Sequence, residues 1–273
     1  MKRITGFSVW IVVLILSTVA CKESKMIGTG NTATLPANIS LNGKLFTSLF
    51  QQKAAEYRAL CLQGYNIARY RIENYKPKTN KKLAIITDID ETLLDNSPYA
   101  VHQAYLGKEF ESASWYNWTS MAMADTMPGA GAFLHFCASK NVEVFYVTNR
   151  DEKERENTIL NLKKLGLPYA DGTHMLTRQT TSTKEPRRQY VMKDHEVILL
   201  MGDNLADFSA LFEKKNMEDR SRQVNSFSAE FGDRFIVFPN SNYGDWEGSL
   251  YNYKYNLSQA QKDSVMKSVL KSY

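Results

Sequence analysis

A short apolar run that begins at Leu83 delivers two aspartates, Asp88 and Asp90, into a polar turn. Uninterrupted apolar runs of about four to eight residues are typical of strands buried on both faces of a parallel sheet. Ligands of such sheets bind beyond the carboxyl ends of the strands. Because side chains alternate along a strand, both aspartates start on one face, where their like charges repel unless a cation lies between them. The pair therefore predicts a parallel sheet with a divalent metal at its edge.

Two further apolar runs end in polar residues in the same way. Residues 142–147 lead into Thr-Asn-Arg at 148–150, and residues 197–201 lead into Gly-Asp-Asn-Leu-Ala-Asp at 202–207. The carboxyl ends of parallel strands meet at one edge of a sheet, so we expect these polar segments to lie near the aspartate pair.

Each acidic segment also has a simpler interpretation. Residues 88–92 could be a solvated turn in which Asp90 or Thr92 caps a helix, and Asp203 could be the N-cap of an ordinary helix. The occurrence of three strands that end in polar residues weighs against both.

Four motifs follow one another along the chain. In order they are Asp88-x-Asp90-x-Thr92, the strand-ending Thr148, a lysine, Lys184, in residues 182–187, and Gly202-Asp203-x-x-x-Asp207. Their order and strand context resemble the haloacid dehalogenase (HAD) superfamily. Residues 88–99 and 202–208 resemble more closely the paired signatures of class C acid phosphatases, the bacterial lipoprotein e(P4) type. Thr87 departs from that pattern, which usually has an apolar residue there, and the resemblance runs from about Ile39 to the C-terminus.

The segments between the motifs predict alternating helices and strands. We expect helices at 43–73, 131–139, 152–165 and 258–270, the last capped by Ser258, and a further strand at 235–238. Such alternation implies right-handed crossovers and a three-layer α/β/α sandwich, which the resemblance makes a Rossmann-like, HAD-like core. Residues 98–128, which contain several aromatics, are expected to form a small, mainly helical cap insert.

The resemblance implies a phosphoryl transfer. Asp88 is then the nucleophile that forms an aspartyl-phosphate, and Asp90 is the general acid and base. One Mg²⁺ is expected on the carboxylates of Asp88 and Asp203 and on the backbone carbonyl of Asp90. This cation and the strand-end position should keep Asp88 ionised well below neutral pH. Asp207, four residues beyond Asp203, should hold metal-bound waters or Lys184.

Other polar residues are candidates for binding phosphate. Thr148 and Asn149 can donate hydrogen bonds to its oxygens, and Lys184 adds a positive charge. Three other cations are alternatives for the role of Lys184: Lys193, Arg187 and Arg188. Two charged residues in predicted loops, Arg150 and Glu91, are expected to support the site or to lie on the surface.

The resemblance also implies a substrate class. In class C enzymes an insert tryptophan and a late tyrosine, which resemble Trp115 and Tyr243, sandwich a nucleobase or aromatic leaving group. The hypothesis is a Mg²⁺-dependent acid phosphatase and 5′-nucleotidase acting on nucleoside 5′-monophosphates or aryl phosphates. Asp88 also admits a phosphomutase or a dehalogenase, although a dehalogenase needs neither the Asp90 acid nor Mg²⁺. A non-catalytic surface binding module on the same scaffold is a further alternative, against which the intact acidic set weighs.

The first 38 residues read as an export segment. Basic residues, an apolar stretch and small residues make 1–20 a signal peptide, and Cys21 looks like the lipidated first residue of a bacterial lipoprotein of the outer membrane or periplasm. Thr18 departs from that pattern, so plain secretion is the alternative. Residues 21–38 are expected to be a tether, and 39–273 the acid phosphatase domain.

The charge distribution argues against a nucleic acid partner. The formal charge of +5 is spread over mixed Lys/Glu helical stretches, and the densest basic runs, 76–82 and 184–188, lack interleaved aromatics, so a nucleic acid polymer is not expected. Cys61 and Cys137 are expected to be buried free thiols, although an oxidising compartment would let them pair. The resemblance implies a homodimer.

Overall fold

Five parallel strands form the central sheet, in the order β5-β4-β1-β6-β7. The computed structural model describes residues 39–273. The strands are β1 (Lys82–Thr87), β4 (Glu143–Asp151), β5 (Met175–Arg178), β6 (His195–Gly202) and β7 (Phe235–Val237). The first strand is at the centre, where Thr87 pairs with Tyr146 of β4 and with Met201 of β6. The polar residues that follow β1, β4 and β6 therefore share one edge of the sheet.

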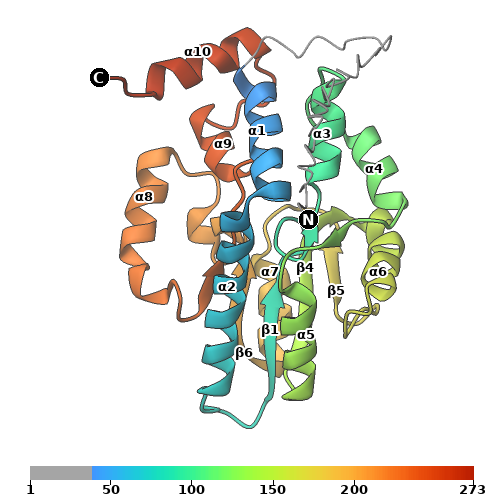
Figure 1. Cartoon of the computed structure of the whole chain (residues 1–273). Coiled ribbons are helices and arrows are strands. Elements are labelled where there is room, and N and C mark those ends of the chain that lie inside the picture. Colours follow the sequence, from blue (N-terminus) through green and yellow to red (C-terminus); the bar gives the residue numbers. More distant parts are fainter. Residues whose placement is uncertain (1–38) are drawn as a thin grey trace, which may run out of the picture. The chain divides into compact units, whose positions relative to one another are not determined.

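Both faces of the sheet are buried, because apolar side chains alternate between them. Ile85 and Val144 face a core that includes α2 and α5, whereas Ile86 and Phe145 face a second core with Val191 of α7. The helices of the first core are α2 (Ala55–Glu73), α5 (Ala130–Ser139) and α6 (Arg155–Lys164), and α7 (Glu185–Asp194) lies behind the sheet (Figure 1). The three-layer α/β/α sandwich with a parallel Rossmann-like sheet is confirmed.

Further helices lie beyond the carboxyl ends of the strands (Figure 1). They are α1 (Ile39–Lys53), α3 (Ser97–Tyr105), α4 (Ser112–Ser120), α9 (Asp245–Leu250) and α10 (Gln259–Val269). Two short strands, β2 (Leu94–Asp95) and β3 (Asp125–Thr126), pair antiparallel at the base of the segment that carries α3 and α4. A capping box at Ser258 starts α10, as its sequence predicts.

Several boundaries differ from the sequence-based expectations. The helix expected over 43–73 is two helices, because Ala54 adopts an extended backbone conformation between α1 and α2. Strand β5 was not anticipated, since its four residues give too short a pattern to distinguish. Strand β4 continues to Asp151, so 148–150 belong to the strand and not to a loop. The remaining elements are α8 (Met217–Ser226) and the 3₁₀ turns η1 (Glu152–Glu154), η2 (Leu205–Asp207), η3 (Ala210–Phe212) and η4 (Ser228–Glu230).

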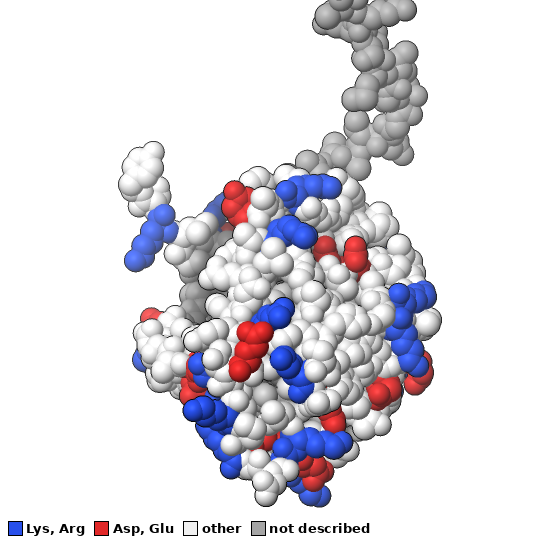
Figure 2. Space-filling view, turned by 60° about the horizontal axis from the view of Figure 1, so that its bottom comes forward, with Lys and Arg blue, Asp and Glu red and all other residues white. Residues whose placement is uncertain are grey.

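The predicted signal peptide, the tether and Cys21 lie outside the described residues. Within 39–273, no helix combines the length and the apolar character that crossing a membrane requires. Cys61 and Cys137 are buried free thiols. On the face shown in Figure 2, lysines and arginines are interspersed with aspartates and glutamates, which agrees with the mixed charge pattern of the sequence.

Candidate active site

Asp88 lies at the carboxyl end of β1, held against its neighbour strand. Its backbone N–H donates to the carbonyl of Met201 at 2.9 Å, which extends the pairing of β1 with β6 by one residue. The Nζ of Lys184, one residue before α7, lies 2.5 Å from Asp88 Oδ1 and 2.6 Å from Asp207 Oδ1. All three side chains are buried, so a cation neutralises part of a carboxylate cluster at the sheet edge.

Three carboxylates converge at this point. One oxygen each from Asp88, Asp203 and Asp207 lies within 4.8 Å of the others. Gly202 makes this possible, because a Cβ atom there would come 2.5 Å from Asp207 Cβ. Asn240 donates to Asp203 Oδ2 at 2.7 Å and orients it. The alternative interpretation of Asp203 as a helix N-cap is wrong, since Asn204 caps η2.

The electrostatics of this cluster favour a further cation. Burial raises the pKa of Asp88 to about 7. The positive charge of Lys184 lowers this pKa, and the negative charge of Asp207 raises it further. Burial and the two neighbouring carboxylates also raise the pKa of Asp203. The pKa of Lys184 is raised overall, because the negative charges of Asp207 and Asp88 outweigh the lowering effect of burial, so Lys184 stays charged. The protein groups alone therefore do not hold Asp88 ionised well below neutral pH, and a hard divalent ion among the carboxylates fits this oxygen-rich set.

Asp90 has its own partners. Arg150 donates to its carboxylate, from Nη2 to Oδ1 at 2.7 Å and from Nε to Oδ1 and Oδ2 at 3.1 and 3.2 Å. Asn96 donates to Asp90 Oδ1 at 2.8 Å. Arg150 is 3% exposed, so it is a buried supporting residue and not a surface one. The side chain of Asp90 is thus held by neutral and cationic donors beside the carboxylate cluster.

Glu91 is also buried, at 1% exposed, and is not a surface residue. Its carboxylate accepts from the Tyr243 hydroxyl and, at 2.8 Å, from the backbone N–H of Asn96. Burial raises the pKa of Glu91 to about 8, and the charge of Asp90 adds to this effect. Glu91 has a φ of 55°, an uncommon conformation for a residue other than glycine.

Of the residues expected to bind phosphate, Lys184 lies in the carboxylate cluster, and Thr148 and Asn149 are bonded to Arg187. Lys184 contacts Asp88, whereas Arg187 donates to the carbonyl of Thr148 and to Asn149 Oδ1, the latter at 2.8 Å. Of the other two alternatives to Lys184, Arg188 donates to the backbone carbonyls of Ala206 and Asp207 and pairs with the carboxylate of Glu185, and Lys193 is exposed. Lys184 is therefore the cation of the cluster, and Arg187 ties Thr148 and Asn149 to α7.

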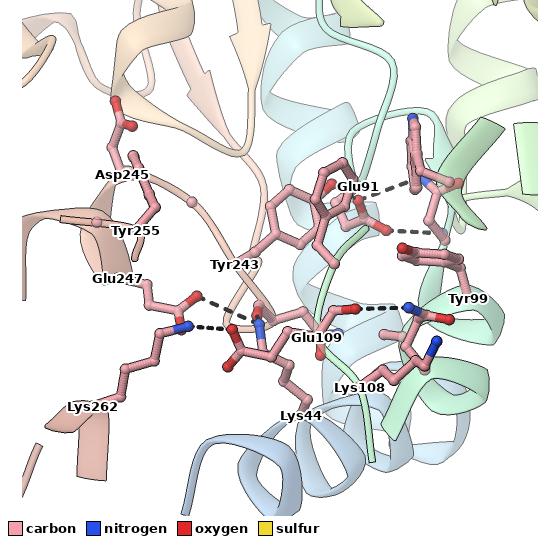
Figure 3. Close-up of a pocket in the computed structure, with 18 of the residues that line it drawn as sticks. Lys44, Glu91, Tyr99, Lys108, Glu109, Tyr243, Asp245, Glu247, Tyr255 and Lys262 are labelled. Carbon is pink, nitrogen blue, oxygen red and sulfur yellow. Dashed lines mark hydrogen bonds and ion pairs between the residues drawn. The ribbon is translucent and has the colours of Figure 1, made fainter. Parts of the chain in front are cut away.

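A cavity of about 710 Å³ is lined by Trp115 and Tyr243. Asn96, which donates to Asp90, also lines it, whereas the residues of the carboxylate cluster do not. Trp115 packs edge-on against Tyr99 with ring centroids 5.1 Å apart. Figure 3 shows Tyr243 beside Glu91, with Lys44, Glu109, Glu247 and Lys262 gathered further along the cavity. The cavity therefore combines aromatic walls with paired charges.

Sequence reasoning gave Asn96 no role, offered Arg187 only as an alternative to Lys184, and did not pair Arg150 with Asp90. Asn96 lies within the first signature and Arg150 directly follows Thr148 and Asn149, so proximity to a motif was the available signal. Their partners are far away along the chain, which a local pattern does not reveal.

Comparisons with known proteins agree with this geometry. The family model described as HAD superfamily, subfamily IIIB (Acid phosphatase) matches residues 8–246. The structure is similar to that of the class C acid phosphatase from Bacillus anthracis, with 39% identity, a TM-score of 0.82 and coverage of 86% of this chain and 99% of that one. A structure of the same relative with tungstate bound matches with 39% identity, the same TM-score and coverage of 85% and 98%.

A more distant relative, acid phosphatase 1 of Solanum lycopersicum, is 26% identical over 130 residues, which are 45% of this chain. The match covers about half the length of that relative, at 50%. The family match and the class C likeness each extend over most of the chain, and the range of the family match includes every residue of the carboxylate cluster. The chain therefore belongs to the acid phosphatases of HAD subfamily IIIB, a family of phosphomonoester hydrolases.

Proposed function

We propose that the protein hydrolyses phosphomonoesters with Asp88 as the nucleophile. The observation that carries this proposal is the convergence of Lys184 on Asp88 and Asp207, with Asp203 in the same cluster. A phosphoryl group in front of Asp88 would meet the positive charge that its equatorial oxygens require.

The reaction has two steps. An oxygen of Asp88 attacks phosphorus as the bond from phosphorus to the leaving oxygen breaks, which gives an aspartyl-phosphate. Asp90 delivers its proton to that leaving oxygen, then removes a proton from water as the water attacks phosphorus and frees Asp88. Lys184 balances the charge on the phosphoryl oxygens in both steps.

Magnesium is the proposed cofactor. The carboxylates of Asp88 and Asp203 and the backbone carbonyl of Asp90 would hold it, and Asp207 would support it beside Lys184. When bound, Mg²⁺ neutralises charge on the carboxylates and the transferring phosphoryl group.

Aryl phosphates and nucleoside 5′-monophosphates are the proposed substrates. The aromatic side chains of Trp115 and Tyr243 line one cavity together with Asn96, a partner of Asp90, and its volume of about 710 Å³ is ample for a nucleoside. Stacking on such rings contributes about 1–3 kcal/mol per base. The tungstate in the class C relative is a tetrahedral oxyanion like phosphate, which supports an oxyanion site.

Phosphate release from p-nitrophenyl phosphate and AMP tests the function. We expect EDTA to abolish release and Mg²⁺ to restore it, and Asp88→Asn to lower kcat by roughly four orders of magnitude, as loss of a nucleophile does. The exposed Asp125→Asn is the matched control and should retain activity. Turnover of chloroacetate, or unchanged phosphate release by Asp88→Asn, would contradict the proposal.

We also propose that the chain is exported and anchored through a lipid on Cys21, as a homodimer in the cell envelope. The leader pattern of residues 1–20 and the small residues before Cys21 support export. The resemblance to class C enzymes supports the dimer.

A further inference from the structure

Asn96 is the centre of a buried hydrogen-bond network beside the proposed acid. Its Nδ2 donates to Asp90 Oδ1 at 2.8 Å, and its Oδ1 accepts from Trp118 Nε1 at 2.8 Å. Its backbone N–H donates to Glu91 Oε1 at 2.8 Å. Three polar groups of one residue thus join Asp90, Glu91 and helix α4.

Glu91 extends this network to the opposite wall of the cavity. Its Oε2 accepts from the hydroxyl of Tyr243, whose ring remains 39% exposed and lines the cavity. In Figure 3 the two side chains lie next to each other. Trp118 belongs to α4, the helix that also carries Trp115. The network therefore runs from one aromatic wall to the other and passes Asp90 on the way.

The local backbone holds this arrangement. Glu91 keeps its positive φ of 55°, and its N–H donates to the carbonyl of Leu94 at 2.9 Å. Asn96 is 2% exposed, so its contacts are shielded from water. An uncommon backbone conformation of this kind persists where the surrounding contacts determine it, and it is concentrated at functional sites.

We propose that Glu91 and Asn96 are positioning residues that link the two walls of the leaving-group cavity to the carboxyl group of Asp90. This inference rests on the proposed function. A leaving group held between the walls keeps Tyr243 and α4 in place, and Asn96 then aims Asp90 at the leaving oxygen. Contacts remote from phosphorus are thereby used in the chemical step and not only in binding.

Leaving groups of different acidity reveal such positioning. An alkoxide needs the proton of Asp90 as its bond to phosphorus breaks, whereas p-nitrophenolate departs without one. Asp90 also activates water in the second step, which both substrates share, so the comparison is made in kcat/KM, which reports the steps up to departure of the leaving group. Misplacing Asp90 should therefore lower kcat/KM for glycerol 3-phosphate and spare kcat/KM for p-nitrophenyl phosphate. A residue with a purely structural role would slow both alike.

Trp118→Phe is the sharpest variant, because it removes the Nε1 donor to Asn96 and keeps an aromatic ring, at a residue that does not line the cavity. We expect kcat/KM for glycerol 3-phosphate to fall about tenfold and kcat/KM for p-nitrophenyl phosphate to change less than about twofold. Glu91→Gln, which replaces one of two acceptor oxygens, should give the same selective loss. Tyr75→Phe is the control, since it deletes a tyrosine hydroxyl bonded to Glu196 at 2.6 Å, away from these contacts.

The outcomes separate the two proposals. Selective loss of kcat/KM for glycerol 3-phosphate in both variants supports the positioning role. Equal losses of kcat/KM for both substrates, or an unchanged kcat/KM for glycerol 3-phosphate, overturn it while leaving the phosphatase intact. A wild-type protein that releases phosphate from neither substrate overturns the proposed function and this inference with it.

Discussion

At the scale of single residues, the site depends on side chains that approach one another closely. Lys184 reaches two aspartates from different segments, and Gly202 leaves the space that Asp207 occupies. A single added methyl group at Gly202 would collide with Asp207, so a small substitution there tests whether the close approach matters.

Gly202→Ala is expected to displace Asp207, because the added Cβ would lie 2.5 Å from Asp207 Cβ. Overpacking of this kind costs about 1–3 kcal/mol of unfolding free energy. We expect a lower melting temperature and a loss of phosphatase activity of about 100-fold, since Lys184 loses one partner. Gly43→Ala is the matched control, because its Cβ meets nothing within 4 Å in α1. Unaltered melting and activity in Gly202→Ala would show that Asp207 can move without consequence.

At the scale of elements, the ends of the central strands carry the contacts that hold them. At the end opposite the active site, Glu196 of β6 accepts from the backbone N–H groups of Lys78 and Thr79, each at 2.7 Å. These bonds fasten the connection between α2 and β1 to β6. The connection leads into β1, whose other end carries Asp88.

The stability supplied by Glu196 should depend on pH. The Thr79 hydroxyl, the Tyr75 phenol and backbone N–H groups lower the pKa of Glu196 from 4.5 to about 2. A depressed carboxyl pKa stabilises the fold above the unfolded pKa, and this contribution disappears as pH falls to the folded pKa. Glu196→Gln should therefore lower the melting temperature at pH 7, with a difference that shrinks between pH 4.5 and about 2. Glu218→Gln, exposed on α8, is the control, and a difference that does not vary with pH would refute the assignment.

At the scale of the whole molecule, distant segments meet around the cavity. Glu109, between α3 and α4, accepts from Ser40 of α1 at 3.2 Å and pairs with Lys262 of α10. The backbone N–H of Ile39 donates to Asp263 at 3.4 Å. The first and last described helices therefore both border the cavity, which Lys44 and Lys262 line.

The proposed anchor belongs to this scale as well. In a bacterial host, the full chain should be recovered in the detergent phase, and its N-terminal peptide should carry a diacylglyceryl thioether at Cys21. Cys21→Ser should remain exported yet partition into the aqueous phase, because a single residue supplies the anchor. Mass spectrometry of the N-terminal peptide distinguishes lipidation from plain secretion, and an unmodified cysteine in the wild type would rule out the lipoprotein.

The sequence was sufficient to predict the layered α/β fold and the acidic residues at its strand ends. An apolar run and the polar residues after it are local, and parallel strands bring their carboxyl ends to one edge whatever the loops between them do. Asp88, Asp203 and Asp207 are found together for that reason.

Only the tertiary structure decided which cation pairs with Asp88 and what holds Asp90. Four cations were candidates for the first role, and Lys184 is the one whose Nζ lies 2.5 Å from Asp88 Oδ1. Arg150 donates to Asp90, which lies 60 residues away in the sequence, and Tyr243 donates to Glu91, which lies 152 residues away. Side-chain pairing at such separations follows from how the elements pack, and no periodicity or spacing along the chain encodes it.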